Sequence, residues 1–399
     1  MKYSITLSSL LFAISPAVFA DTHDATNQRI TQLEQQLIEL KTQVKTQVKT
    51  QEETEKAAEP NIKIGGAVRF QYSYEDYNEE NRDRVGDLDF DVFRLDVNGS
   101  IGDVSVSAQY RWYQYMDVIH HAYVGYKFDE EWQGQLGITQ VPFGVLDYNS
   151  NSFFFSSGYY VGLEDDFDAG ISFIRKSGNH DLRLAFFKND EQGGIDGYVG
   201  DRTDRYSYDV IGITDGEEMA ESNTFNARYA YNFSNTEVGI SLQHGDLAGK
   251  NDSLGSHSAY AVHVKSQIEN IGVMFQFSDY EYDLDDGSET VSVGAYSFSD
   301  NIPAEAKLYN LNLSYSMDVD MGPVTNLKFY NDFNLMTDKS GDYDNDTVMN
   351  VVGVAVSAGG IYSYIDLITA KNQPFIGGSM ANDNDDWNTR LNINVGYYF

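Results

Sequence analysis

From residue 61 to the C-terminus, apolar and polar side chains alternate with a period of two, the spacing that places successive side chains on opposite faces of a β-strand. The chain closes on LNINVGYYF, with Leu391, Ile393, Val395, Tyr397 and Phe399 on one face and Asn392, Asn394, Gly396 and Tyr398 on the other. The segments 62–74, 103–113, 223–231 and 307–315 alternate in the same way, with aromatic residues near the ends of the apolar face. The pattern predicts strands with an apolar face and a polar or small-residue face.

The connections between these strands alternate in length. Seven are short turns of three to six residues, and eight are mostly longer and acidic, such as 141–166 and 189–222. This rhythm predicts an all-β fold, a 16-stranded antiparallel transmembrane β-barrel with apolar residues towards lipid and polar residues towards the lumen. The segment VSVGAYSF, 291–298, could be a seventeenth strand. It is assigned to a loop, because an even strand count places both chain termini on the same side of the membrane. The alternative is a soluble β-sandwich, which polar residues in about sixteen consecutive strands disfavour.

The first 20 residues have the pattern of a signal peptide. Lys2 precedes the apolar run ITLSSLLFAISPAVF, and Val18-Phe19-Ala20 forms a small-residue cleavage site. A membrane anchor is the alternative, but the run is short and contains Pro16. We therefore expect a signal peptide at 1–20, a coiled-coil segment and linker at 21–60, and the barrel at 61–399, with the coil in the periplasm and the barrel in the outer membrane of a Gram-negative cell.

Residues 21–60 carry a different period. A 3, 4, 3, 4 spacing relates the five apolar residues Ile30, Leu33, Leu37, Leu40 and Val44. This is the a/d seam of a coiled coil, and two to three heptads are marginal for a lone helix, so a partner is implied. The alternative is an amphipathic helix that lies on its own domain. The seam does not fix the number of helices in the coil.

The chain carries 27 Lys and Arg against 61 Asp and Glu, a net charge of −34, and no Cys. The acidity argues against nucleic acid as a partner, since phosphate backbones attract clustered Lys and Arg. The absence of Cys excludes disulfides and thiolate metal sites. The acidic loops predict a negative vestibule that shares divalent cations with lipopolysaccharide or favours cation entry. We expect no cofactor.

The inward parity of the strands nevertheless selects a basic set. It contains Arg69, Arg94, Arg111, Lys127, Arg183, Arg228, Lys328 and Arg390, with Asp96 on the same parity as Arg94. Charged rings on a pore wall set ion selectivity. The alternative is that these side chains pair with interior carboxylates and brace the wall.

Residues 141–166 are the candidate constriction loop, because this segment is long and follows a strand. Its candidate residues are Asp147, Tyr148, Phe153, Phe154, Phe155, Glu164, Asp165 and Asp166. Folded into the lumen, Asp147 and Glu164 would face the basic wall and create a transverse field. The three Phe residues would stack on a sugar or nucleoside, or would anchor the loop to the wall.

Two other classes of function are alternatives to a channel. A hydrolase would need a nucleophile, a base and an acid at one barrel height; of the pair His120 and His121, only His121 is expected to face inward, and no HExxH motif occurs. A receptor or adhesin would display the acidic loops. We expect a non-enzymatic channel for passive diffusion of small hydrophilic solutes and ions.

Three segments resemble the phosphate-selective porin O and P family of trimeric outer-membrane porins: FRLDVNGSIGDVSVSAQYRW at 93–112, HHAYVGYKF at 120–128 and GITQVPFGV at 137–145. The resemblance implies a porin and a homotrimer. The chain departs from the family before Arg94, where DFDVF (89–93) offers Asp89 and Asp91 in place of further Arg. Carboxylates repel phosphate, so the resemblance does not carry phosphate selectivity, and anion or cation preference stays open.

Overall fold

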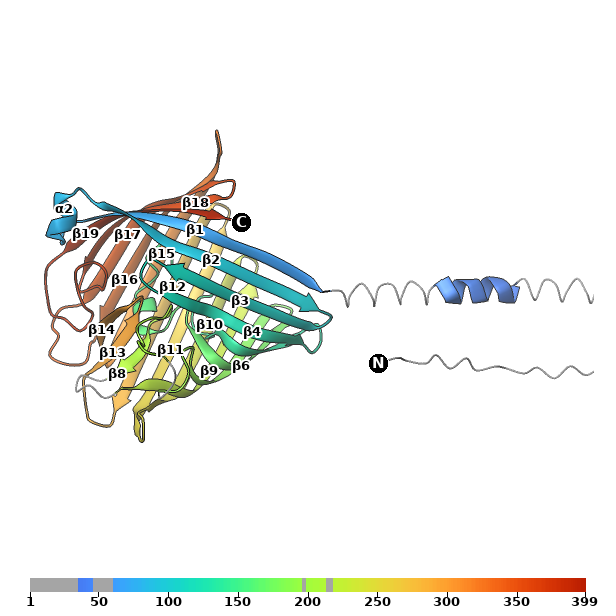
Figure 1. Cartoon of the computed structure of the whole chain (residues 1–399), viewed down its shortest axis with the longest axis horizontal. Helices are drawn as coiled ribbons and strands as arrows, with labels where there is room; N and C mark the ends of the chain where they lie inside the picture. Colours follow the sequence, from blue (N-terminus) through green and yellow to red (C-terminus); the bar gives the residue numbers. More distant parts are fainter. Residues whose placement is uncertain (1–34, 46–59, 196–198, 213–217) are drawn as a thin grey trace, which may run out of the picture. The chain divides into compact units, whose positions relative to one another are not determined.

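The computed structural model describes residues 35–45, 60–195, 199–212 and 218–399 (Figure 1). The chain divides into two compact units, Met1–Glu59 and Pro60–Phe399. The described part of the first unit is a helix at 35–45 with exposed side chains, which include Leu37, Leu40 and Val44 of the predicted seam. The predicted signal peptide and the seam residues Ile30 and Leu33 lie outside the described residues.

Within the described residues, no helix combines the length and the apolar character that crossing a membrane requires.

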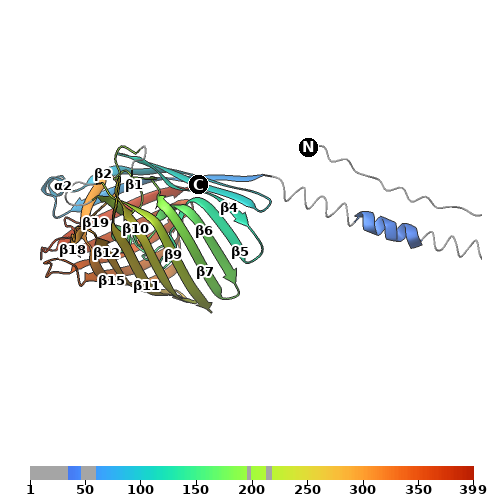
Figure 2. The ribbon, with the colours of Figure 1, turned by 90° about the horizontal axis from the view of Figure 1, so that it is seen from below.

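Sixteen strands of the described chain form a closed antiparallel barrel, as the sequence predicts. They are β1 (Asn61–Glu75), β2 (Asp87–Ile101), β3 (Val104–Tyr113), β4 (Asp117–Lys127), β5 (Trp132–Gln140), β6 (Phe167–Ser177), β7 (His180–Asp190), β9 (Ala220–Phe233), β10 (Thr236–Ala248), β11 (Ser253–Ile268), β12 (Ile271–Leu284), β15 (Glu305–Met321), β16 (Val324–Thr337), β17 (Thr347–Ala358), β18 (Ile361–Lys371) and β19 (Asn388–Tyr398). Figure 2 shows β6, β7, β9 and β10 lying side by side in the tilted wall.

The last strand closes the barrel against the first. Ala67 in β1 lies opposite Tyr398 in β19, and the backbone groups of Gly66 and Phe399 exchange hydrogen bonds of 3.0 and 3.1 Å. The strand pairing therefore leaves no free edge in the wall. Closure of this kind provides hydrogen-bond partners for the backbone N–H and C=O groups without water.

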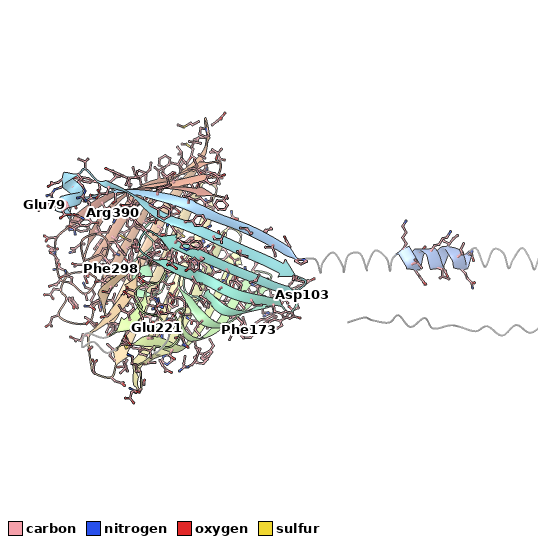
Figure 3. All side chains as sticks on the ribbon, in the orientation of Figure 1. Glu79, Asp103, Phe173, Glu221, Phe298 and Arg390 are labelled. Carbon is pink, nitrogen blue, oxygen red and sulfur yellow. The ribbon has the colours of Figure 1, made fainter. Side chains whose placement is uncertain are left out.

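The connections follow the predicted rhythm of seven short turns at one end and eight loops at the other. Figure 3 labels Asp103, in a short turn, and Glu79, in the first loop, at opposite ends of the barrel. That loop contains the helix α2 (Glu79–Asp83). A 3-10 helix, η1 (Tyr159–Val161), lies in the loop between β5 and β6.

The two faces of the wall differ as predicted. On the outside, Phe225 is 61% exposed and Val395 is 44% exposed, while on the inside Asn226 is 4% and Asn394 is 0% exposed. The polar faces are thus shielded inside the barrel, and the apolar faces form its outer surface. This arrangement suits a lipid surround and a hydrated interior.

The segment 291–298 is not part of the barrel wall, as predicted, but it forms strands rather than an irregular loop. β13 (Thr290–Ala295) and β14 (Phe298–Pro303) form a hairpin, and β8 (Asp209–Gly212) adds a third strand. Val210, Val291 and Ile302 of this sheet are buried and belong to the same apolar cluster as Tyr159 of the loop between β5 and β6. We call these three strands the inner sheet; the sequence analysis missed it.

Candidate functional site

Residues 141–166, here called loop three, fold into the lumen and reach the opposite wall. Wall side chains accept hydrogen bonds from its backbone N–H groups, and three of these acceptors lie in β10, β12 and β16. These bonds run from Gly144 N to Ser241 Oγ (2.9 Å), from Val145 N to Gln276 Oε1 (2.8 Å) and from Ser157 N to Asn334 Oδ1 (3.0 Å). Loop three is therefore fixed across the barrel by side chains that the inward parity supplies.

Tyr148 lies at the meeting point of three cavities. Its side chain lines a cavity of about 430 Å³ beside Arg94 and Arg183, a second of about 550 Å³ beside Lys328, and a third of about 550 Å³ beside Arg69. Tyr148 is 46% exposed, so loop three presents this residue to open space. The lumen is narrowed at this residue rather than closed around a single enclosed pocket.

The lining of these three cavities is basic although the chain is acidic. Its seven cationic side chains are Arg69, Arg94, Arg111, Lys176, Arg183, Lys265 and Lys328, and its three anionic side chains are Asp147, Asp165 and Glu237. Water-filled clefts lined by one sign of charge concentrate the opposite ion. Five of the eight predicted basic wall residues belong to this set.

The remaining predicted basic residues serve other purposes. Arg228 is buried, donates to Gly144 O of loop three (2.7 Å) and pairs with Glu237 (2.5 Å). Arg390 pairs with Glu75 (3.0 Å). These two side chains brace the wall by pairing with carboxylates, which was the alternative to a role in ion selectivity. Lys127 is exposed near a short turn and is not among the residues that line the three cavities.

Bracing and lining also occur in the same side chain. Arg94 lines two of the cavities and pairs with Asp96 at 2.9 Å, and Arg183 lines one and pairs with Asp181 at 3.1 Å. Among the described residues, none forms a carboxylate salt bridge with Arg111, whose guanidinium lies 4.2 Å from the centre of the Tyr206 ring. The wall therefore neutralises Arg111 less than it neutralises Arg94 and Arg183.

The acids of loop three separate into two groups. Asp147 and Asp165 line the same cavity as Arg94 and Arg183, as expected of a transverse field. Glu164 does not face the basic wall: its carboxylate turns back into loop three and accepts from Asn149 N (2.8 Å) and Ser156 N (3.0 Å). The expectation for Glu164 is wrong because the loop's own unpaired N–H groups compete for the carboxylate.

Burial affects the protonation of both Glu164 and Asp165. It raises the pKa of Glu164 to about 7 and that of Asp165 to about 8. Tyr206 Oη donates to Asp165 at 2.5 Å, which opposes the increase in the Asp165 pKa without cancelling it. Asp166 points elsewhere and accepts a bond from Phe167 N (2.8 Å). Because Asp165 lines the first cavity, its protonation removes one negative charge from the lumen and leaves the lumen more positive.

Two of the three Phe residues contact the wall, and the third packs within loop three. Arg69 lies 4.8 Å from the centre of the Phe153 ring, Arg390 lies 5.2 Å from that of Phe154, and Phe155 stacks on Tyr159 at 4.1 Å. These contacts favour anchoring of loop three over stacking on a solute.

A β-bulge changes the predicted orientation of one histidine. Gln109 pairs with His121 and Tyr110 with Ile119, so His120 is an extra residue in β4. As a result both histidines line the cavity beside Arg111, which corrects the expectation that only His121 faces inward. Ser107 Oγ lies 2.9 Å from His121 Nε2, but the other nitrogen of that ring faces His120 rather than a carboxylate. The set lacks the orienting acid that a serine hydrolase uses.

Two tyrosines from the loops were missed by the sequence analysis. Tyr206 and Tyr296 line the third cavity, and Tyr159 donates to the backbone oxygen of Tyr206 and to Tyr296 Oη (3.1 Å). They lie in the two loops that contribute the inner sheet. The only sequence signal was the abundance of Tyr in the long acidic loops, which is too general to select either residue.

No family model and no curated protein matches this sequence. Solved structures do match its fold. The anion-selective porin from Comamonas acidovorans has a TM-score of 0.56 at 13% identity and covers 86% of this chain and 100% of its own. The outer membrane channel DcaP of Acinetobacter baumannii has a TM-score of 0.56 at 11% identity over 86% and 98%. The trimer form of OmpT, an outer membrane protein of Vibrio cholerae, has a TM-score of 0.54 at 12% identity over 85% and 99%. The chain thus shares its fold with porins of the outer membrane of Gram-negative bacteria.

Proposed function

We propose that this protein is an outer-membrane porin, a water-filled channel for passive diffusion of small hydrophilic solutes and ions. The observation that carries the proposal is the position of Tyr148 on loop three, where three cavities meet inside a closed barrel. A loop bonded to the opposite wall narrows the passage and leaves charged side chains around it. Such a passage selects by size and by field and requires neither catalysis nor a cofactor.

The charge of the lining favours anions at the constriction. The seven cationic side chains exceed the three anionic ones, and the raised pKa of Asp165 reduces the negative charge further near neutral pH. The acidic loops oppose anion entry at the mouth, most strongly at low salt. We therefore propose a modest anion preference. The fold of the Comamonas anion-selective porin is compatible with it.

Membership of the phosphate-selective porin O and P family is a finer proposal, supported only by the three segments quoted above. Against phosphate selectivity stands Asp91, an extra residue in β2 whose carboxylate pairs with Arg69. A phosphate would have to compete with that carboxylate for the guanidinium. We infer a general anion path rather than a dedicated phosphate site.

The assembly is proposed to be a homotrimer, with residues 1–20 removed and the coil at 21–60 in the periplasm. The exposed apolar side chains of Leu37, Leu40 and Val44 on one helix support a helical partner. The trimer form of the Vibrio cholerae protein, which has a similar fold, supports this proposal. The outer apolar band would contact lipid, and the acidic loops would contact lipopolysaccharide.

The test is the zero-current potential of the purified protein in a planar bilayer under a KCl gradient. We expect conducting steps and a potential of the sign for chloride preference. Phosphate added afterwards should reduce the current no more than an equal concentration of sulfate. Absence of conducting steps would overturn the channel and favour a receptor or adhesin. Selective block by phosphate would instead support the finer family proposal.

A further inference from the structure

A cluster of carboxylates is buried where the barrel wall meets the inner sheet. Asp168 is the second residue of β6, Glu191 directly follows β7, and Asp209 is the first residue of β8. One carboxylate oxygen from each lies within 4.8 Å of the others. Asp190, opposite Asp168 in the strand pairing, belongs to the same group. Nothing in the channel described above uses these side chains.

Two arginines neutralise part of this charge. Arg205 pairs with Asp209 at 2.8 Å and with Asp190 at 3.3 Å, and it also donates to Glu191 through Nε at 3.1 Å. Arg202 pairs with Asp190. The buried carboxylates of this group therefore outnumber its two guanidinium groups, which leaves the cluster short of positive charge. Buried charges of this kind need a counter-charge or protonation.

Asp168 is the side chain on which the deficit falls. It is 2% exposed, and its Oδ1 has no hydrogen-bond partner in the described structure. No arginine pairs with it, although its carboxylate points into the cluster with Glu191 and Asp209. A buried carboxylate with an unpartnered oxygen, beside two further carboxylates, is the arrangement expected of an incomplete coordination shell.

We propose that Asp168, Glu191 and Asp209 bind one divalent cation of the Ca²⁺ type. Ca²⁺ takes oxygen ligands at about 2.3–2.6 Å, so two of its ligands lie at most about 5 Å apart, and the 4.8 Å limit fits this span. The charge of the ion would offset part of the excess negative charge, and the ion would share Glu191 and Asp209 with Arg205. Backbone oxygens or water would complete the shell.

The site would link three separate pieces of chain. Asp168 belongs to the wall, Glu191 to the start of the loop after β7, and Asp209 to the inner sheet. Glu221, labelled in Figure 3, is the second residue of β9, and its carboxylate accepts a hydrogen bond from Tyr282 Oη at 3.3 Å. A bound cation would therefore fasten the inner sheet to the wall. The site differs from the exposed acidic loops, whose carboxylates face solvent.

The test is calcium titration calorimetry on the purified full chain after treatment with a chelator. We expect one tight site per chain, weakened at least tenfold by Asp168→Asn and unchanged by Asp344→Asn. The control makes the same change in an exposed acidic loop, so it reports any weak binding at the surface. Binding to D168N as tight as to the unsubstituted protein would overturn the proposal, as would the absence of any tight site.

Thermal unfolding with and without CaCl₂ gives a second measurement. At 100 times the dissociation constant, calcium should raise the folded-to-unfolded ratio of the unsubstituted protein about 100-fold. It should leave D168N nearly unchanged. In chelator, D168N should be no less stable than the unsubstituted protein, because Asp168 Oδ1 makes no hydrogen bond to lose. Should D168N not fold, E191Q applies the same test, and calcium stabilisation of E191Q equal to that of the unsubstituted protein would overturn the site.

Discussion

The carboxylate of Asp332 in β16 holds Asn151 of loop three, accepting hydrogen bonds from Asn151 N at 2.7 Å and from Nδ2 at 2.8 Å. A third bond comes from Ser152 N at 2.7 Å. Asn151, Ser152 and Asp332 are all buried, so removal of the carboxylate leaves hydrogen-bond donors without an acceptor where water does not reach them easily. The relationship identifies Asp332 as a residue that positions the constriction.

Asp332→Ala should therefore loosen loop three. We expect a larger and noisier single-channel conductance, and a loss of at least about 3 kcal/mol of unfolding free energy, since each of the three hydrogen bonds to the charged group contributes about 1.5–3 kcal/mol. Asp320→Ala, at an exposed position near a short turn, is the matched control. Equal conductance in D332A and D320A would show that the loop does not depend on this carboxylate.

Strand parity predicted the barrel because one rule applies to every strand. Asn394 faces inward and Val395 outward for the same reason as Asn226 and Phe225. The rule fails where one residue is inserted. The bulges in β2 and β4 give Asp91 and His120 inward orientations that a strict alternation cannot assign.

Contacts between distant loops were also beyond the sequence. The inner sheet joins 209–212 to 290–303, two segments that are separated by several wall strands. The orientation of Glu164 depends on which N–H groups loop three leaves free after folding. Neither property has a local sequence signature, because both depend on pairings that exist only once the barrel is closed.

The pairing of Asp91 with Arg69 suggests a way to change selectivity. Asp91→Asn should free the Arg69 guanidinium and remove a negative charge from the lumen, so chloride preference and block by phosphate should both increase. Zero-current potentials with added phosphate measure the change. Asp103→Asn, in a short turn, serves as the control. A D91N channel with the phosphate response of the unsubstituted protein would remove Asp91 from the explanation.

Lys328 and Lys127 offer a matched comparison of two predicted wall lysines. Lys328 lines a cavity, whereas Lys127 is exposed near a short turn. Lys328→Gln should reduce the chloride-to-potassium permeability ratio about threefold, the factor that ~0.6 kcal/mol gives for a unit charge roughly 7 Å away in water. Lys127→Gln should have little effect. A larger change in K127Q than in K328Q would contradict the assignment of the lining.

Asp165 makes the selectivity depend on pH. Its pKa rises from 3.8 to about 8 because of burial, so it is largely protonated at pH 6 and ionised at pH 9. Anion preference should therefore fall as pH rises through about 8, and Asp165→Asn should abolish that fall. The same raised pKa stabilises the folded state below pH 4, and this contribution is lost as pH increases from about 4 to about 8. Zero-current potentials that are identical at pH 6 and pH 9 would argue against this role.

The helix at 35–45 offers a test of assembly that does not involve the lumen. Leu37 lies on the predicted seam and is 56% exposed, while its neighbour Ile38 lies off the seam and is 63% exposed. Burial of Leu37 against a partner helix would remove apolar surface from water, so Leu37→Asn should weaken the oligomer and Ile38→Asn should not. Native mass measurements of the two variants in detergent, beside a chain lacking 21–60, separate the cases. If all three remain as oligomeric as the unsubstituted protein, the barrel wall alone holds the subunits together, and the coil has no role in assembly.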